Sequence, residues 1–119
     1  MTESMHKRFE KIHEYLTTIE HVKAIQKPEY KLIIYYYHKF DFFLLDQEKN
    51  VLVFKDPLFD YKPGEFFFKE HLHNLHPYPY LNRGAWSAYN LGHSVPISEI
   101  FDLITLNKTY YIDLIANKS

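Results

Sequence analysis

Hydrophobic residues near the start of the chain recur at the spacing of one helix face. Their intervals are four, three, four and three residues, at Met5, Phe9, Ile12, Leu16 and Ile19. Such a stripe is typical of an amphipathic helix that packs on a core. Charged residues, Arg8 among them, occupy the other faces. We expect the helix to be capped at Thr2 or Ser4 and to end near Gln26, because Pro28 cannot continue it.

After this first segment, short runs of β-branched and aromatic residues replace the helical spacing. The runs span residues 31–37, 40–45, 51–54 and 65–68. Each is too short and too bulky to favour a helix. Polar residues 46–50 and a turn at 61–64 reverse the chain between them. The pattern predicts an α+β domain in which the first helix covers one face of an antiparallel meander of three or four strands.

The last third of the chain is harder to assign. Residues 69–92 have no clear period, and we expect a long irregular loop there, of a kind that is usually functional. A second helix is expected from about Ser94 or Val95, with Pro96 in its first turn. Residues 110–115 fit either a final strand or a helix, and the pattern does not decide between them.

Composition narrows the classes of function. A chain of 119 residues fits a single domain, residues 1–119, and its 11 Tyr and 10 Phe can build the core or line a binding face. A net charge of −1 gives no general basic field for nucleic acid. The absence of cysteine excludes disulfides, thiolate metal sites and a thiol nucleophile. No apolar run reaches the roughly 20 residues of a membrane span, so we expect a cytoplasmic protein. We also expect no cofactor.

Three histidines close together, His71, His73 and His76, are the first candidate for chemistry. Imidazoles at this spacing suit zinc if a loop brings them together, and they also suit general acid–base catalysis, since imidazole titrates near neutrality. The residues around them resemble the TumE-like RNase toxins of bacterial toxin–antitoxin pairs, through residues 51–56 and the first two histidines. That resemblance implies a histidine-dependent hydrolase.

The order of motifs in the second half resembles the ubiquitin-conjugating (E2) fold and its catalytically inactive UEV and RWD relatives. The matching segments are residues 62–68, 76–78, 84–87 and 95–100. In this resemblance Ser87 stands where the family has its catalytic cysteine, and Tyr78 stands where it has an asparagine. It therefore implies a binding module without conjugating activity, since no thioester can form without a thiol.

The first hypothesis is a non-catalytic protein-interaction module, E2/UEV-like or a small inhibitor or immunity-type protein. We expect its partner to be another protein, with aromatic anchors in the irregular loop at Tyr78, Tyr80, Trp86 and Tyr89. This first hypothesis requires neither a catalytic residue nor a metal-binding residue. The alternative is the histidine-dependent hydrolase, in which His71, His73 and His76 supply the chemistry and nucleic acid is the substrate.

Overall fold

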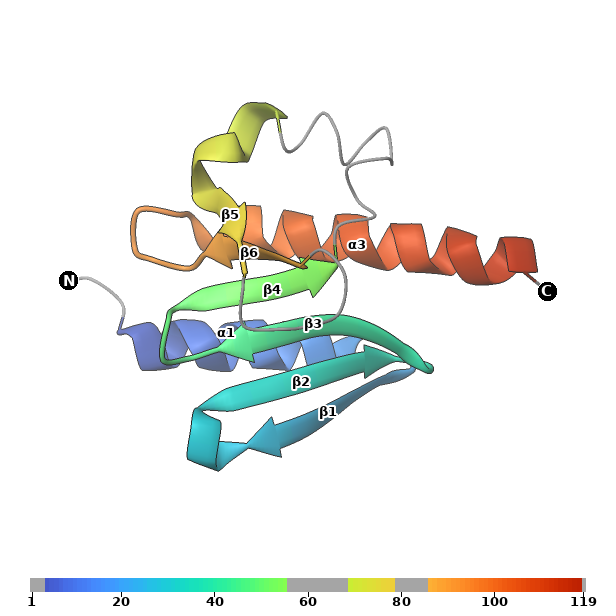
Figure 1. The fold of residues 1–119 in the computed structure, drawn as a ribbon, viewed down its shortest axis with the longest axis horizontal. Helices are drawn as coiled ribbons and strands as arrows, with labels where there is room; N and C mark the ends of the chain where they lie inside the picture. Colours follow the sequence, from blue (N-terminus) through green and yellow to red (C-terminus); the bar gives the residue numbers. More distant parts are fainter. Residues whose placement is uncertain (1–3, 56–68, 79–85, 119) are drawn as a thin grey trace.

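A computed structural model describes residues 4–55, 69–78 and 86–118 (Figure 1). In chain order its elements are α1 (Met5–Thr18), β1 (Val22–Lys27), η1 (Pro28–Tyr30), β2 (Leu32–Tyr37), β3 (Phe40–Asp46), β4 (Val51–Lys55), η3 (Leu72–Asn74), β5 (Leu75–Pro77), β6 (Trp86–Asn90) and α3 (Ile97–Lys118). The predicted α+β class is confirmed.

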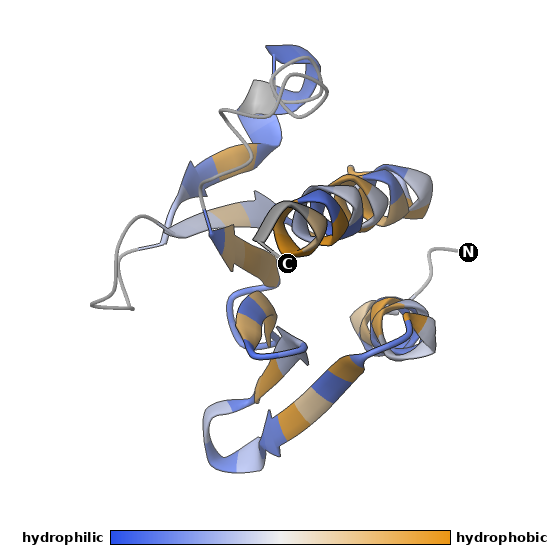
Figure 2. Ribbon diagram, turned by 90° about the vertical axis from the view of Figure 1, so that its right-hand side faces the viewer, coloured by the Kyte–Doolittle hydropathy of each residue, from blue (hydrophilic) through white to orange (hydrophobic). Residues whose placement is uncertain are grey.

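The strands form one antiparallel sheet of six strands in the order β1-β2-β3-β4-β6-β5. Both helices lie on the same side of this curved sheet (Figure 2). They contact each other through the rings of Tyr15 and Phe101, which stack with their centroids 4.5 Å apart. The sheet therefore has a covered inner face, an outer face, and two edges, at β1 and β5.

Aromatic side chains fill much of the core between the sheet and the helices. The fully buried rings include Tyr35, Phe42, Phe43, Phe54 and Tyr89. The predicted stripe of the first helix packs on them, because Phe9, Ile12 and Leu16 are buried in the same cluster. Burial of these large rings explains how a short chain obtains a sizeable hydrophobic core.

The first helix is shorter than the sequence pattern predicts. It ends at Thr18, and residues 22–27 form β1 instead of the expected last turns of helix. His21, in the turn between α1 and β1, has a left-handed backbone with φ of 71°, and it directs the chain into β1. All six residues of β1 then pair with β2, from Val22 opposite Tyr37 to Lys27 opposite Leu32. If residues 22–27 continued the helix instead, the backbone N–H and C=O groups along this side of β2 would lose these hydrogen-bond partners.

Arg8 also differs from the expectation that it lies on the solvent face. It is buried, and its guanidinium donates to the carbonyl oxygens of Leu91 (3.0 Å) and Val95. These bonds tie the start of α1 to the segment that leads into α3. The planar guanidinium carries several N–H donors and can bond two carbonyl oxygens at once, so the buried charge has hydrogen-bond partners.

The segment expected to be an irregular loop contains regular structure. Residues 75–77 form β5 and residues 86–90 form β6, which lies between β4 and β5 in the sheet. The expected turn at 61–64 and the expected strand at 65–68 lie outside the described residues. The ambiguous residues 110–115 are helical and belong to α3.

Candidate functional site

The three histidines of the predicted cluster have different environments. His71 lies just before η3, and its Nδ1 is 3.1 Å from Glu99 Oε1, whereas His73 and His76 are exposed to solvent. Within residues 4–55, 69–78 and 86–118, no three His, Asp or Glu side chains are grouped so that they could hold a metal ion. The structure thus gives one histidine a carboxylate partner and does not assemble a zinc site from the described residues.

Glu99, in the first turn of α3, is the centre of a polar network that sequence reasoning missed. Its Oε2 accepts hydrogen bonds from Tyr89 Oη (2.5 Å) and Asn74 Nδ2 (2.9 Å), and its Oε1 faces His71. Burial, together with the bond to this carboxylate, raises the pKa of the Tyr89 phenol well above its usual range. The network joins η3, β6 and α3, and it also fixes the orientation of one imidazole. No sequence pattern around Tyr89 or Glu99 indicates that these two side chains are in contact.

The predicted aromatic anchors are mostly internal. Tyr89 is fully buried in the main core, and Tyr78 and Trp86 are each only 8% exposed. The last two belong to a smaller hydrophobic cluster with Leu44 and Val53 from the neighbouring strands. Tyr80 lies outside the described residues. The rings of the three described anchors stabilise the fold, and little of their surface is open to a partner in this conformation.

Exposed apolar side chains lie instead at the opposite edge of the sheet. Among the described residues the large hydrophobic side chains with the most exposure are Tyr30 (63%), Ile25 (45%) and Ile112 (42%). The first two belong to the edge hairpin, which we define as residues 22–37, comprising β1, η1 and β2. Half-buried apolar residues of β2, Leu32, Ile34 and Tyr36, pair across from β1 and extend this apolar surface.

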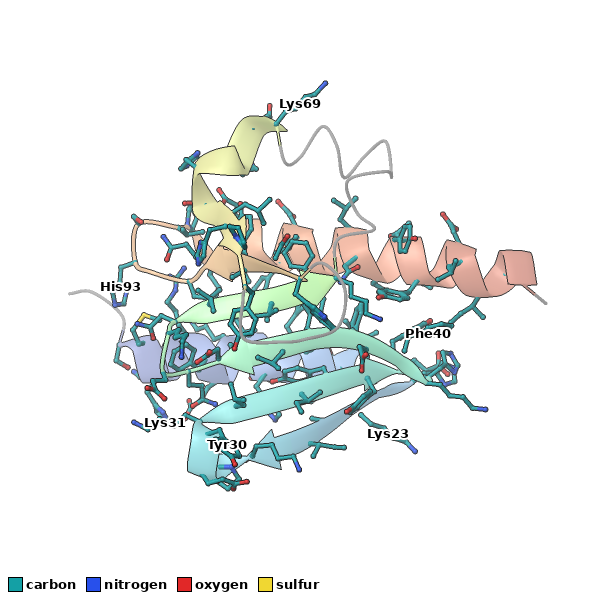
Figure 3. The ribbon with its side chains drawn as sticks, in the orientation of Figure 1. Lys23, Tyr30, Lys31, Phe40, Lys69 and His93 are labelled. Atoms are coloured by element: carbon teal, nitrogen blue, oxygen red, sulfur yellow. The ribbon has the colours of Figure 1, made fainter. Side chains whose placement is uncertain are left out.

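Lysines flank the apolar residues of the edge hairpin. Lys23 and Lys27 alternate with Ile25 along β1, so the three side chains point to the same side of the strand. Lys31, at the end of η1, has a left-handed backbone, and its carbonyl oxygen accepts from Gln47 N at 3.0 Å, which fixes the turn that carries Tyr30. Lys23, Tyr30 and Lys31 lie along the β1 side of the molecule in Figure 3. The edge is thus both apolar and positively charged.

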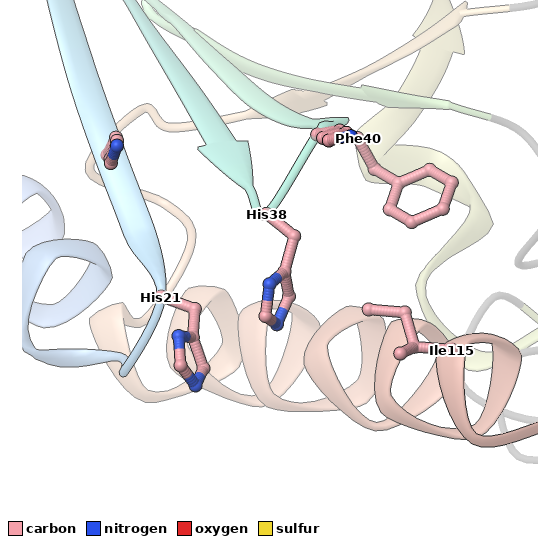
Figure 4. Close-up of a pocket in the computed structure, with 6 residues that line it drawn as sticks. His21, His38, Phe40 and Ile115 are labelled. Carbon is pink, nitrogen blue, oxygen red and sulfur yellow. The ribbon is translucent and has the colours of Figure 1, made fainter. Parts of the chain in front are cut away.

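A pocket of about 530 Å³ opens where β1 begins and β2 turns into β3. Its lining residues are His21, Lys23, His38, Lys39, Phe40 and Ile115. The two imidazoles stack with centroids 4.3 Å apart, and Phe40 and Ile115 lie across the pocket from them (Figure 4). The sequence could not reveal this pair, because the histidines are separated by most of the edge hairpin.

Comparisons with known proteins give one informative structural match. No protein-family model matches the chain, and no curated protein matches its sequence. The crystal structure of the Deinococcus radiodurans protein DR2400, described as a DUF419 domain, matches with a TM-score of 0.60 over 84% of this chain and 75% of that chain. The two proteins share a fold. At 18% sequence identity the match shows the fold alone.

The resemblance to the ubiquitin-conjugating fold is therefore wrong. The fold matches the DUF419 protein, and nothing in the comparison points to an E2 relative. Ser87, placed by that resemblance at an active-site cysteine, lies within β6, where it pairs with Phe54 on one side and Pro77 on the other. The motif His76-Pro77-Tyr78 includes part of the edge strand β5. Short motifs can match by chance when the surrounding topology differs.

The helices of the described residues include none that is long and apolar enough to span a membrane.

Proposed function

We propose that the protein is a non-catalytic protein-interaction module that binds its partner along the edge hairpin. The observation that carries the proposal is the exposure of Ile25 beside Lys23 and Lys27 on the edge strand β1, and of Tyr30 in the turn that follows it. Exposed edge strands with apolar side chains favour pairing with another chain unless they are protected. A small inhibitor or immunity-type protein is one role that such a module can fill.

Strand addition is the binding mode that fits this edge. An extended segment of the partner pairs with the backbone of β1 and places alternate side chains on the outer face of the sheet. Lys23, Lys27 and Lys31 favour a partner segment with acidic side chains at matching positions. Among the described residues none of these three lysines takes part in an ion pair, so their charges are available to that segment.

Tyr30 is the expected energetic centre of the contact. Tyrosine is enriched among interface residues whose truncation costs about 2 kcal/mol or more. Such a loss corresponds to roughly a thirtyfold weaker affinity. Because Tyr30 is 63% exposed and lies outside the core, its truncation should leave the fold intact.

Site-specific photo-crosslinking tests the proposal. A photoreactive phenylalanine at position 30, in the protein expressed in its own host cells, should capture a partner that the same residue at position 112 does not capture. Ile112 is the matched control, because it is also an exposed apolar residue but lies on α3. With the purified partner, Tyr30→Ala and Lys27→Glu should each weaken binding at least tenfold, and Ile112→Ala should not. Equal capture at both positions, or unchanged affinity for Tyr30→Ala, would refute the proposal.

One observation favours a second candidate, the histidine-dependent hydrolase. The 3.1 Å approach of His71 Nδ1 to Glu99 resembles the pairing that orients a general base. Under this hypothesis His71→Ala abolishes cleavage of RNA by the purified protein, while Tyr30→Ala has no effect on it. Under the interaction-module proposal the wild-type protein leaves RNA intact, and its binding to the partner survives His71→Ala.

A further inference from the structure

The pocket at the end of the edge hairpin brings four basic side chains together. His21 precedes β1, Lys23 lies in it, and His38 and Lys39 form the turn between β2 and β3. His38 N donates to His21 O at 3.1 Å, which holds the two turns against each other. The two ends of the edge hairpin thus meet at the pocket.

Both histidines have an unfavourable backbone conformation. The φ angles are 71° for His21 and 54° for His38, in the left-handed region that residues other than glycine adopt uncommonly, histidine more often than most. Each such residue costs on the order of 1–3 kcal/mol, and residues of this kind cluster at functional sites. Glycine or asparagine would occupy these positions with less strain. Both left-handed turns place their imidazoles on the wall of the same pocket.

The charges around the pocket favour an anion. Lys23 and Lys39 line it, and among the described residues neither side chain is engaged in an ion pair or a hydrogen bond. Glu20 is an acidic group beside the pocket, but it points into solvent: its Oε1 is 3.7 Å from His21 Nε2 and its side chain is 88% exposed. Lysine and protonated histidine both bind phosphoryl oxygens through charge-assisted hydrogen bonds.

The remaining walls are apolar. Phe40 and Ile115 face the histidines across the pocket in Figure 4. The ring of Tyr37 packs edge-on against His38, with centroids 4.8 Å apart, and supports the stacked pair from within the sheet. A volume of about 530 Å³ lies within the range of small-ligand sites. The pocket therefore offers a charged half and an apolar half.

We infer that this pocket binds a small phosphate monoester, with the phosphoryl group on His21, His38, Lys23 and Lys39 and an apolar or aromatic group against Phe40 and Ile115. This ligand site goes beyond the proposed function. The pocket shares Lys23 with the edge hairpin but does not include Tyr30. Tyr30→Ala should therefore leave ligand binding unchanged, and failure of either proposal can be recognised separately.

Phenyl phosphate is the probe. Calorimetry at about pH 6.5 should show binding, and the imidazole signals of His21 and His38 should shift in NMR spectra, while those of His6 should not. Inorganic phosphate should bind roughly tenfold more weakly, because it lacks the ring, and phenol should not bind measurably. The double variant Lys23→Gln/Lys39→Gln should lose at least tenfold in affinity.

The histidines are tested by His21→Asn/His38→Asn, since asparagine tolerates the left-handed backbone. This variant should keep or raise the melting temperature and lose at least tenfold in affinity, whereas His6→Asn, at an exposed position on α1, should bind normally. Absence of phenyl phosphate binding up to about 10 mM, or wild-type affinity in either double variant, would overturn the inference.

Discussion

The Glu99 network yields a prediction that separates a structural carboxylate from a catalytic one. Glu99→Ala removes the acceptor of Tyr89 and Asn74, and it also removes the partner of His71. Hydrogen bonds to a charged group contribute about 1.5–3 kcal/mol each when they are sheltered from water. Tyr89 is fully buried and the Glu99 side chain is 13% exposed, so two such bonds, taken at the lower end of this range, suggest a loss of about 3 kcal/mol.

A loss of that size is readily measured by thermal unfolding. For 119 residues the entropy of unfolding is about 250 cal/mol/K, so about 3 kcal/mol lowers the melting temperature by about 12 °C. Glu99→Gln keeps one acceptor oxygen and should lose less. Glu10→Ala is the control, because Glu10 is 63% exposed and pairs only with an exposed imidazole, His6, in the described structure. Its melting temperature should change by less than about 2 °C. If Glu99→Ala unfolds at the same temperature as Glu10→Ala, the network does not stabilise the fold, and the carboxylate is free for another role.

Two further predictions concern the core. Leu16→Ala should destabilise the protein by about 2–5 kcal/mol in urea unfolding, because Leu16 is fully buried on α1; an unchanged midpoint would show that α1 does not pack on the sheet. Burial raises the pKa of Tyr111 to about 12. The folded protein therefore holds this proton more tightly than the unfolded chain, whose tyrosine titrates near pH 10, and the resulting roughly 2–3 kcal/mol of stability is lost between about pH 10 and pH 12. Tyr111→Phe should flatten that part of the urea-unfolding profile, and an equally steep profile would contradict the assignment.

The elements that could be predicted from the sequence are those with a strong local pattern. The stripe of the first helix and the aromatic runs of β2 and β3 each encode their own structure through spacing and bulk. The end of α1 could not be predicted, because the conformation of residues 22–27 depends on pairing with β2. β5 was missed for a similar reason, since a strand of three residues containing Pro77 is defined only by its neighbour β6.

The candidate sites depended even more on long-range contacts. The sequence drew attention to His71, His73 and His76 because they are adjacent, but proximity along the chain did not group them in space. It also assigned Trp86 and Tyr89 to a binding surface because aromatic residues serve both interfaces and cores, and only the fold distinguishes the two uses. The stacked pair of His21 and His38 arises from strand pairing and left-handed turns, and no sequence pattern predicts either of these.

Hydrogen–deuterium exchange of the wild-type protein, alone and with its purified partner, tests the central claim most directly. If the partner adds a strand to the edge hairpin, the backbone amides of β1, residues 22–27, should exchange more slowly in the complex, since they lie at an open edge in the free protein. Amides of β6, which lies between two strands, should change little. Slower exchange confined to residues 69–78, with β1 unchanged, would contradict the account.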